Sequence, residues 1–477
     1  MPDVFPLPGL VVANATVVNS FGRQPAHIVV HDGRIEALLD AAGPVPDAQR
    51  TIDAAGKLVI PGGVDGHCHV AQVTGRFSTL DDYATTSAAA LWGGTTTIID
   101  FGIPRDAKET PLEAVRAKKE LAAISRCDYA LHGSVIDWDE SVPWQLEQLA
   151  AEGVRSVKMY TTNRGTTMAE GSTILKVMRE MVRLDGLTYI HAEHDPIIAD
   201  CTQQHADAGT IGIEHLHDTR PELAEEISVR EVLAMAEYAG APVYFVHQTT
   251  PGAVDLVSTA RSRGQEAFSE TCPHYLTLDE TVYGEKFPEW YACCPPMRSP
   301  QTVAALRKRL AAGAVHTVAS DHSCYDLSQK RERTDDVRAM PHGLPGVETR
   351  MPVTFTAMMA STGARVEDFV EVFSAGPARI NAVPGKGVIA EGYDADLVVF
   401  DPLEERVVDG ARLHMGTDFS PFDGKALTGW PAVVISGGRV VVSDGTFHDP
   451  GPVGRFVHQD GFHEHRAQSP ASMVAQL

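Results

Sequence analysis

The chain has 477 residues, of which 43% are hydrophobic and 22% are charged, a composition typical of a globular enzyme and not of a disordered chain. Acidic residues outnumber Lys and Arg by 63 to 40, and the formal net charge of −23 disfavours nucleic acid and anionic membrane surfaces as partners. The N-terminus lacks the pattern of a secretory signal, and no apolar run reaches the ~18 residues of a membrane helix. The seven cysteines, an odd number, indicate reduced thiols, so we expect a cytoplasmic protein.

Both ends of the chain are rich in β-type residues. Near the N-terminus, residues 11–19 and 26–39 read as strands, with His31-Asp32-Gly33 as a hairpin turn. Near the other end, residues 396–400 and 433–443 repeat the pattern around Gly437-Gly438. Neither end alone has enough strands to bury a sheet face. We therefore predict one small β-sandwich domain built from residues 1–59 and 386–455, followed by a C-terminal tail over residues 456–477.

The middle of the chain alternates between short apolar runs and helical patterns. The strand-like runs are residues 58–60, 95–101, 129–136, 154–160, 187–191, 243–247, 267–271 and 315–320. Helical patterns between several of them cover residues 112–124, 174–184, 221–238 and 303–310. This alternation predicts an α/β fold, a closed parallel (β/α)8 TIM-like barrel over residues 60–385. An open doubly wound sheet would need a Gly-rich phosphate loop after its first strand, and residues 61–67 do not form that loop.

Metal-ligating side chains lie at or just after the ends of several predicted strands. They are His67, His69, Lys158, His191, His247 and Asp321. The carboxyl ends of the strands form the catalytic face of such a barrel, so these distant residues should converge. Imidazole and carboxylate groups are ligands for divalent cations of the zinc type. The sequence therefore predicts a metal centre at one rim of the barrel.

Lys158 is the unusual member of this set, because an ammonium group has no lone pair and repels cations. It can bind metal if it is neutral, or if carbon dioxide has added to its amine to give a carbamate, N6-carboxylysine. A carbamate has two oxygens and can bridge two ions. We expect His67, His69 and Asp321 on one ion and His191 and His247 on the other, with the carbamate and a hydroxide between ions ~3.5–4 Å apart.

The same residues lie in motifs that resemble those of the cyclic amidohydrolases, namely hydantoinases, dihydropyrimidinases, allantoinases and, more distantly, dihydroorotases. The matching stretches are residues 61–69, 156–160, 191–193, 246–247, 270–276, 295–298, 320–322, 343–348 and 394–397. The resemblance implies a barrel with a β-sandwich, a carbamylated lysine, two divalent ions that are usually zinc, and a homotetramer or homodimer. It also implies hydrolysis of a small cyclic amide.

The chain departs from the family pattern at several positions. Ala71 stands where dihydroorotases carry an arginine for the substrate carboxylate, which argues against dihydroorotate. Asn163 stands where D-hydantoinases and dihydropyrimidinases carry a tyrosine thought to stabilise the oxyanion, a feature more like the L-hydantoinase and allantoinase branches. Either Asn163 or Tyr160, which lies two residues after the lysine, could replace that tyrosine. Cys294 and His342 replace a common serine and asparagine of the substrate clamp. Phe77 either lines a hydrophobic substrate pocket or packs its own loop down.

These observations predict hydrolysis of a C–N bond in a hydantoin-like ring by the bridging hydroxide. Asp321 would take the proton and return it to the leaving nitrogen, and His322 would orient a ligand or the substrate. Allantoin, dihydropyrimidines and other cyclic imides stay open as substrates, because the loops over residues 70–81 and 161–170 carry no readable pattern. A non-catalytic scaffold relative is the rival class; loss of metal ligands would mark it, and all six positions are filled.

Overall fold

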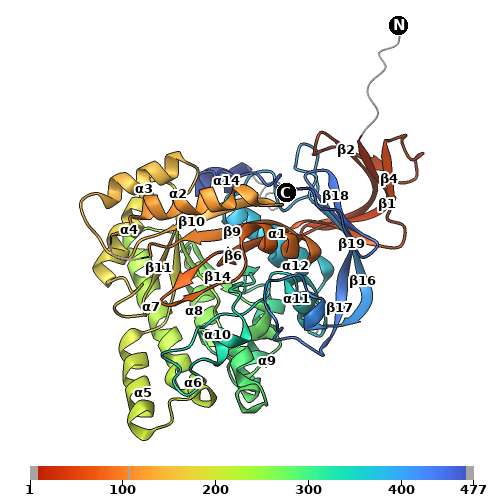
Figure 1. The fold of residues 1–477 in the computed structure, drawn as a ribbon. Coiled ribbons are helices and arrows are strands. Elements are labelled where there is room, and N and C mark those ends of the chain that lie inside the picture. Colours follow the sequence, from red (N-terminus) through yellow and green to blue (C-terminus); the bar gives the residue numbers. More distant parts are fainter. Residues whose placement is uncertain (1–8, 106–107, 362, 469–477) are drawn as a thin grey trace.

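The computed structural model describes residues 9–105, 108–361 and 363–468, in which a parallel barrel stands beside a smaller β-rich domain (Figure 1). Eight strands pair in the order β15-β14-β13-β12-β11-β10-β9-β6, and every pairing between them is parallel. The strands are β6 (Gly63–Cys68), β9 (Thr95–Gly102), β10 (Asp128–Ser134), β11 (Ser156–Tyr160), β12 (Leu187–His191), β13 (Val243–Phe245), β14 (Ala267–Thr271) and β15 (Thr317–Val318). The predicted barrel is confirmed.

The barrel closes where its first and last strands meet. A parallel bridge joins Cys68 to His322, and the His69 amide donates a hydrogen bond to the His322 carbonyl at 2.7 Å. The Ser320 amide donates to the Asp65 carboxylate at 3.0 Å just below this point. Closure therefore brings the end of β6 directly against the segment that follows β15.

The prediction that residues 58–60 form the first barrel strand is wrong. They belong to β5 (Leu58–Pro61), which pairs with β1 (Leu10–Asn19) and β16 (Leu397–Val407) of the other domain. A short apolar run fits either sheet equally well, so its pattern does not identify its partner. The chain changes sheets at Gly62, where a Cβ would lie 2.1 Å from the Thr96 hydroxyl oxygen.

Helices surround the barrel and begin and end with ordinary capping signals. Thr110 and Glu113 form a capping box at the start of α2, with Pro111 at its first turn. Gly240, with φ of 66°, ends α7 in the left-handed conformation. The main helices are α1 (Tyr83–Trp92), α2 (Pro111–Leu121), α3 (Val142–Ala151), α4 (Gly171–Arg183), α5 (Asp195–Ala208), α7 (Glu222–Ala239), α8 (Pro251–Ser262), α9 (Pro300–Ala311) and α11 (Arg350–Met359). Within the described ranges, no helix has the length and hydrophobicity needed to span a bilayer.

The β-rich domain is a nine-stranded mixed sheet to which both ends of the chain contribute, as predicted. Its remaining strands are β2 (Gly22–His31), β3 (Arg34–Asp40), β4 (Arg50–Asp53), β17 (Ala426–Ser436), β18 (Arg439–Ser443) and β19 (Thr446–Phe447). The two predicted hairpins are present, and the turn residues Asp32, Gly33, Gly437 and Gly438 all have positive φ. The domain boundaries proposed from the sequence stay predictions.

The described part of the C-terminal tail packs against the barrel. The Tyr129 amide donates to the Arg455 carbonyl at 2.9 Å, and the Val457 amide donates to the Tyr129 carbonyl at 2.7 Å. Beyond this ribbon, α14 (Phe462–Gln468) carries His463, which contacts the carboxylates of Asp185 and Glu266. The tail thereby pairs with the N-terminal end of β10, at the end of the barrel opposite the predicted metal ligands.

A buried ion cluster joins the two domains. The Lys386 ammonium is 1% exposed and lies 2.6 Å from Asp128 of the barrel, 2.6 Å from Asp396 and 3.0 Å from Asp394. Burial lowers the pKa of Lys386, but the three carboxylates more than offset this and raise it above its usual value. Arg455 is a second, more exposed cation, 2.6 Å from Asp128 and 2.8 Å from Asp394, but removal of Lys386 would leave the buried Asp396 without a cation partner among the described residues.

We therefore expect Lys386→Met to cost on the order of 3–5 kcal/mol of unfolding free energy, the range for breaking a buried pair. The matched control is Lys57→Met, because Lys57 pairs with Asp401 at a partly exposed position and should cost less than about 1 kcal/mol. Urea denaturation of both variants measures the difference. Equal midpoints would contradict a structural role for the cluster.

Candidate metal centre

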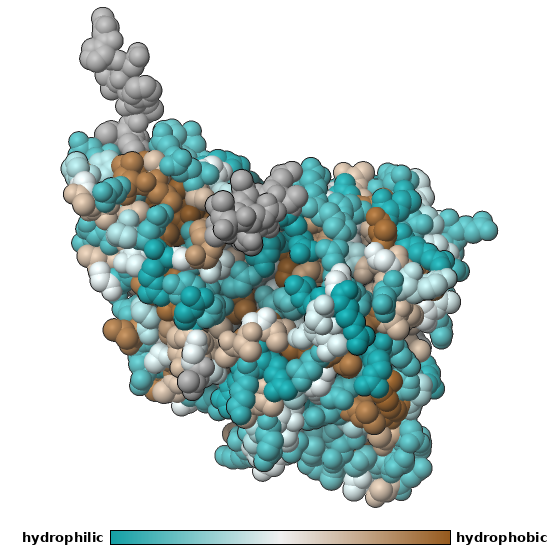
Figure 2. Space-filling model, turned by 180° about the vertical axis from the view of Figure 1, so that it is seen from behind, coloured by the Kyte–Doolittle hydropathy of each residue, from teal (hydrophilic) through white to brown (hydrophobic). Residues whose placement is uncertain are grey.

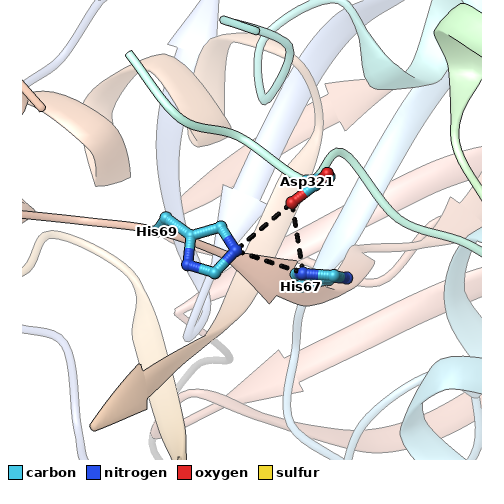
Figure 3. A group of neighbouring side chains, drawn as sticks. All are labelled: His67, His69 and Asp321. Atoms are coloured by element: carbon cyan, nitrogen blue, oxygen red, sulfur yellow. Dashed lines mark hydrogen bonds and ion pairs between the residues drawn. The ribbon is translucent and has the colours of Figure 1, made fainter. Parts of the chain in front are cut away.

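Three side chains converge where the barrel closes. His67 Nε2 lies 3.2 Å from His69 Nε2 and 3.1 Å from Asp321 Oδ1, and His69 Nε2 lies 3.3 Å from the same oxygen (Figure 3). His67 belongs to β6, His69 follows it, and Asp321 follows β15. A tetrahedral ion with bonds of ~2.0–2.1 Å separates its ligands by about 3.3 Å. The triangle thus has the dimensions of one face of a metal site.

The protonation states suit metal binding. Burial, together with the nearby Lys158, lowers the pKa of His67 well below its usual value, so the ring is neutral. Its Nδ1 donates to Glu270 Oε1 at 2.8 Å, which leaves the lone pair on Nε2. Burial alone would raise the pKa of Asp321, but the two histidines lower it, so this carboxylate is ionised.

A second pair of histidines lies beside this triangle. The rings of His191, at the end of β12, and His247, after β13, have centroids 4.5 Å apart, and His247 is 5.4 Å from His67. His191 Nε2 donates to Glu193 at 2.6 Å, while His247 Nδ1 is buried without a hydrogen-bond partner among the described residues. Burial lowers the pKa of both rings. Each therefore has a lone pair available for a cation.

Lys158 lies on β11, 1% exposed, with its Nζ 4.8 Å from the centroid of the Phe101 ring. None of the ion pairs among the described residues involves it, which excludes a structural lysine paired with an acid. Burial lowers its pKa to about 8, although Asp321 and Glu270 act in the opposite direction. The amine can therefore lose its proton near neutral pH. Neutral imidazoles, a carboxylate and a neutralisable amine together fit a pair of divalent cations.

A cavity of about 810 Å³ opens onto this centre. It is lined by all six predicted ligands and all four predicted substrate contacts, namely His67, His69, Lys158, His191, His247, Asp321, Phe77, Asn163, Cys294 and His342. Residues that are up to 275 positions apart in the chain (67 to 342) thus face one space. The volume suits a small-molecule site.

The four predicted substrate contacts differ in their exposure and in their contacts with neighbouring residues. Phe77 is 8% exposed and carries the Arg76 guanidinium 4.8 Å above its ring, so it both lines the cavity and packs the loop. Asn163 is exposed, has φ of 72°, and donates its amide to the Thr167 hydroxyl at 3.3 Å. The Cys294 thiol contacts His342 Nδ1, and His342 Nε2 donates to the Val337 carbonyl at 2.8 Å.

Several orienting residues were present in the sequence motifs without an assigned role. Glu270 holds His67, and Glu193 holds His191 while receiving two hydrogen bonds from Arg220 at 3.0 and 2.6 Å. None of the motifs includes Asp81. Its carboxylate lies 3.0 Å from His322 Nε2, and the backbone carbonyl of His322 accepts a hydrogen bond from the His69 amide. Outer partners of this kind fix the orientation of metal ligands. Sequence spacing could not reveal the roles of Glu270 and Asp81, because each comes from a different strand or loop than the histidine it contacts, whereas Glu193 lies only two residues after His191.

Comparison with known proteins gives a consistent result. The model of the amidohydrolase family matches residues 58–441. A D-hydantoinase of Ralstonia pickettii is 35% identical over 457 residues, which cover 94% of this chain and 98% of that protein. A dihydropyrimidinase of Rattus norvegicus is 33% identical over 467 residues, covering 95% and 89%.

Solved structures agree with these sequence matches. A D-hydantoinase structure superposes with a TM-score of 0.91 at 33% identity and covers 95% of this chain and 99% of that one. An L-hydantoinase (dihydropyrimidinase) of Arthrobacter aurescens gives a TM-score of 0.86 at 28% identity, covering 95% and 100%. The likeness therefore extends over both the barrel and the β-rich domain.

Glu270 provides a test of the centre. Glu270→Gln keeps the shape but removes the charge that orients His67, so we expect metal affinity to fall ~10–100-fold. Glu225→Gln is the matched control, because Glu225 is also buried, and burial likewise raises its pKa to about 7, but it contacts Thr249 and not a histidine. Metal titration of the metal-free variants measures both. A loss of affinity in the control alone would contradict the assignment.

Proposed function

The chain belongs to the amidohydrolase family and is a metal-dependent hydrolase of cyclic amides, and we propose that its substrate is a neutral, hydantoin-like ring. The observation that carries this proposal is that six ligand-type side chains and a small-molecule cavity coincide. Allantoin, dihydropyrimidines and other cyclic imides present the same amide chemistry and are the alternative substrates. The filled ligand set argues against a scaffold without activity.

The metal centre is proposed to hold two divalent ions, which we take to be Zn²⁺. His67, His69 and Asp321 would hold one ion and His191 and His247 the other, with Lys158 contributing to both. Bound ions of this kind activate a water molecule and polarise the amide carbonyl. The protein is proposed to act in the cytoplasm as a homotetramer or a homodimer, in line with the resemblance noted above.

Lys158 is proposed to be N6-carboxylysine. Its neutral amine would add to the carbon of carbon dioxide and lose a proton, which gives an anionic carbamate with two oxygens. The lowered pKa of about 8 provides the neutral amine that this reaction needs. Carbamylation also replaces a buried positive charge by a negative one beside neutral imidazoles, which removes the repulsion of an ammonium toward the cations.

Asp321 is proposed to be the acid–base residue. Its pKa lies below the usual range, so it is ionised at neutral pH and can accept a proton from the attacking water. The same carboxyl group then delivers this proton to the leaving ring nitrogen as the C–N bond breaks. Its position on the cavity wall allows both transfers without a second base.

Tyr160 is proposed to stabilise the charge that develops on the amide oxygen. It lies two residues after Lys158 on β11, on the same face of the strand, and lines the cavity. Buried tyrosines elsewhere, such as Tyr83 and Tyr244, donate their hydroxyls to carboxylates, whereas no hydrogen bond among the described residues involves the Tyr160 hydroxyl. Its donor is therefore free for the substrate. Asn163 stays a predicted substrate contact, at the exposed edge of the cavity.

A turnover panel tests the function. We expect the metal-loaded enzyme to hydrolyse at least one of the neutral rings, meaning 5-substituted hydantoins, allantoin, dihydrouracil or small imides. Dihydroorotate should give a kcat/KM at least ~100-fold lower, because its carboxylate would find no dedicated cation. Ala71 provides none, and Arg76 pairs with Glu332 at 2.7 Å. Efficient turnover of dihydroorotate, or none of the neutral rings, would contradict the proposal.

A paired substitution tests the oxyanion donor. Tyr160→Phe removes only the hydroxyl, and we expect kcat to fall ~10²–10³-fold with little change in KM. Asn163→Ala is the control and should change kcat by less than about tenfold. Metal content of both variants should match the parent enzyme. The reverse ranking of the two variants would assign the role to Asn163.

A further inference from the structure

A second group of metal-ligating side chains lies outside the catalytic centre. It consists of His205 on α5, His215 at the end of a short turn of helix (Ile213–His215), and Asp218 on α6 (Leu216–Thr219). One ligand atom from each residue lies within 4.8 Å of those of the other two. In Figure 1, α5 and α6 lie together on the side of the barrel away from the β-rich domain. Two segments separated by a loop thus present nitrogen and oxygen donors to one point.

The tautomer of His205 is fixed by its surroundings. Its Nδ1 lies 3.1 Å from the Thr210 carbonyl oxygen and 3.0 Å from the Thr210 hydroxyl. A carbonyl can only accept a hydrogen bond, so the proton of the neutral ring is on Nδ1 and the lone pair is on Nε2. Histidines that bind metal usually have such an outer partner on their other nitrogen. His205 therefore offers a lone pair on Nε2, and its ring centroid lies 5.4 Å from that of His215.

His215 and Asp218 complete the donor set. His215 Nδ1 lies 3.0 Å from one Asp218 oxygen, and His217 Nε2 lies 3.5 Å from the other. His217 stacks on Tyr283 at a centroid distance of 5.6 Å, which holds it beside the carboxylate. Two imidazoles and a carboxylate are ligands of a zinc-type ion, and the partial exposure of the group leaves positions for water.

We propose that His205, His215 and Asp218 form a third divalent-cation site of the zinc type, separate from the catalytic pair. An ion here ties α5 to the segment that leads into Arg220. Both segments line the catalytic cavity, α5 through Ile198 and Thr202 and the following segment through Leu216 and Thr219. Arg220 in turn holds Glu193 against the catalytic histidine His191. The site braces one wall of the cavity and takes no part in the reaction itself.

The test counts zinc on the holoenzyme with its catalytic ions loaded. Equilibrium dialysis against micromolar Zn²⁺ should show a third equivalent per chain. The double variant His205→Ala, His215→Ala should bind this equivalent at least ~10-fold more weakly, as should the smaller change Asp218→Asn. His463→Ala is the matched control, because His463 is also an exposed histidine between two carboxylates, and it should retain the third ion.

Hydrogen exchange supplies a readout that does not depend on activity. Zinc should slow exchange over residues 195–219 in the parent enzyme and in His463→Ala, but not in the double variant. Binding of only two ions per chain, or a third ion that survives the double substitution and Asp218→Asn, would overturn the proposal. The outcome is independent of the reaction catalysed, since neither measurement uses a substrate.

Discussion

The centre depends on one unfavourable burial, that of the Lys158 amine. An isolated ammonium in a water-excluded site is costly, and the side chain responds by becoming easier to deprotonate. No carboxylate pairs with Lys158 among the described residues, although Asp321 and Glu270 act on it through space. Burial also lowers the pKa of His67, His191 and His247, so these three rings are neutral. The barrel thus brings nitrogen lone pairs and one ionised carboxylate together around a space that suits divalent cations.

The predicted metal ligands are oriented by neighbouring residues that take no direct part in the reaction. Glu270 and Glu193 fix which nitrogen of His67 and of His191 carries the proton, and Arg220 holds Glu193 in place. Closure between Cys68 and His322 sets the approach of His69 to Asp321. Asp321 and His247 have φ of 50° and 38°, conformations that cost side-chain-bearing residues ~1–3 kcal/mol. Closure of the barrel and hydrogen bonds from neighbouring residues therefore hold the predicted metal ligands in positions that the unstrained backbone would not favour.

Much of this arrangement follows from the sequence. Alternating strands and helices predict a barrel, and strand ends at the carboxyl rim bring His67, Lys158, His191 and Asp321 together. The partner sheet of residues 58–60 could not be predicted, because three apolar residues fit either sheet. Packing of the tail on β10 was hidden as well, since it uses backbone groups that leave no mark in the sequence. The choice between Asn163 and Tyr160 as oxyanion donor stayed open in the sequence, although the period of two places Tyr160 on the same strand face as Lys158.

We infer that Lys158, as a carbamate, would supply an anionic ligand to both ions, and the decisive measurement is the metal content of Lys158→Ala. One substitution removes a ligand from each ion, so the variant should lose bound metal. Short carboxylates such as acetate or propionate should restore part of it by occupying the vacated space, whereas uncharged amides of similar size should not. If Lys158→Ala retained two tightly bound ions without any added acid, the bridge would have been assigned to the wrong residue.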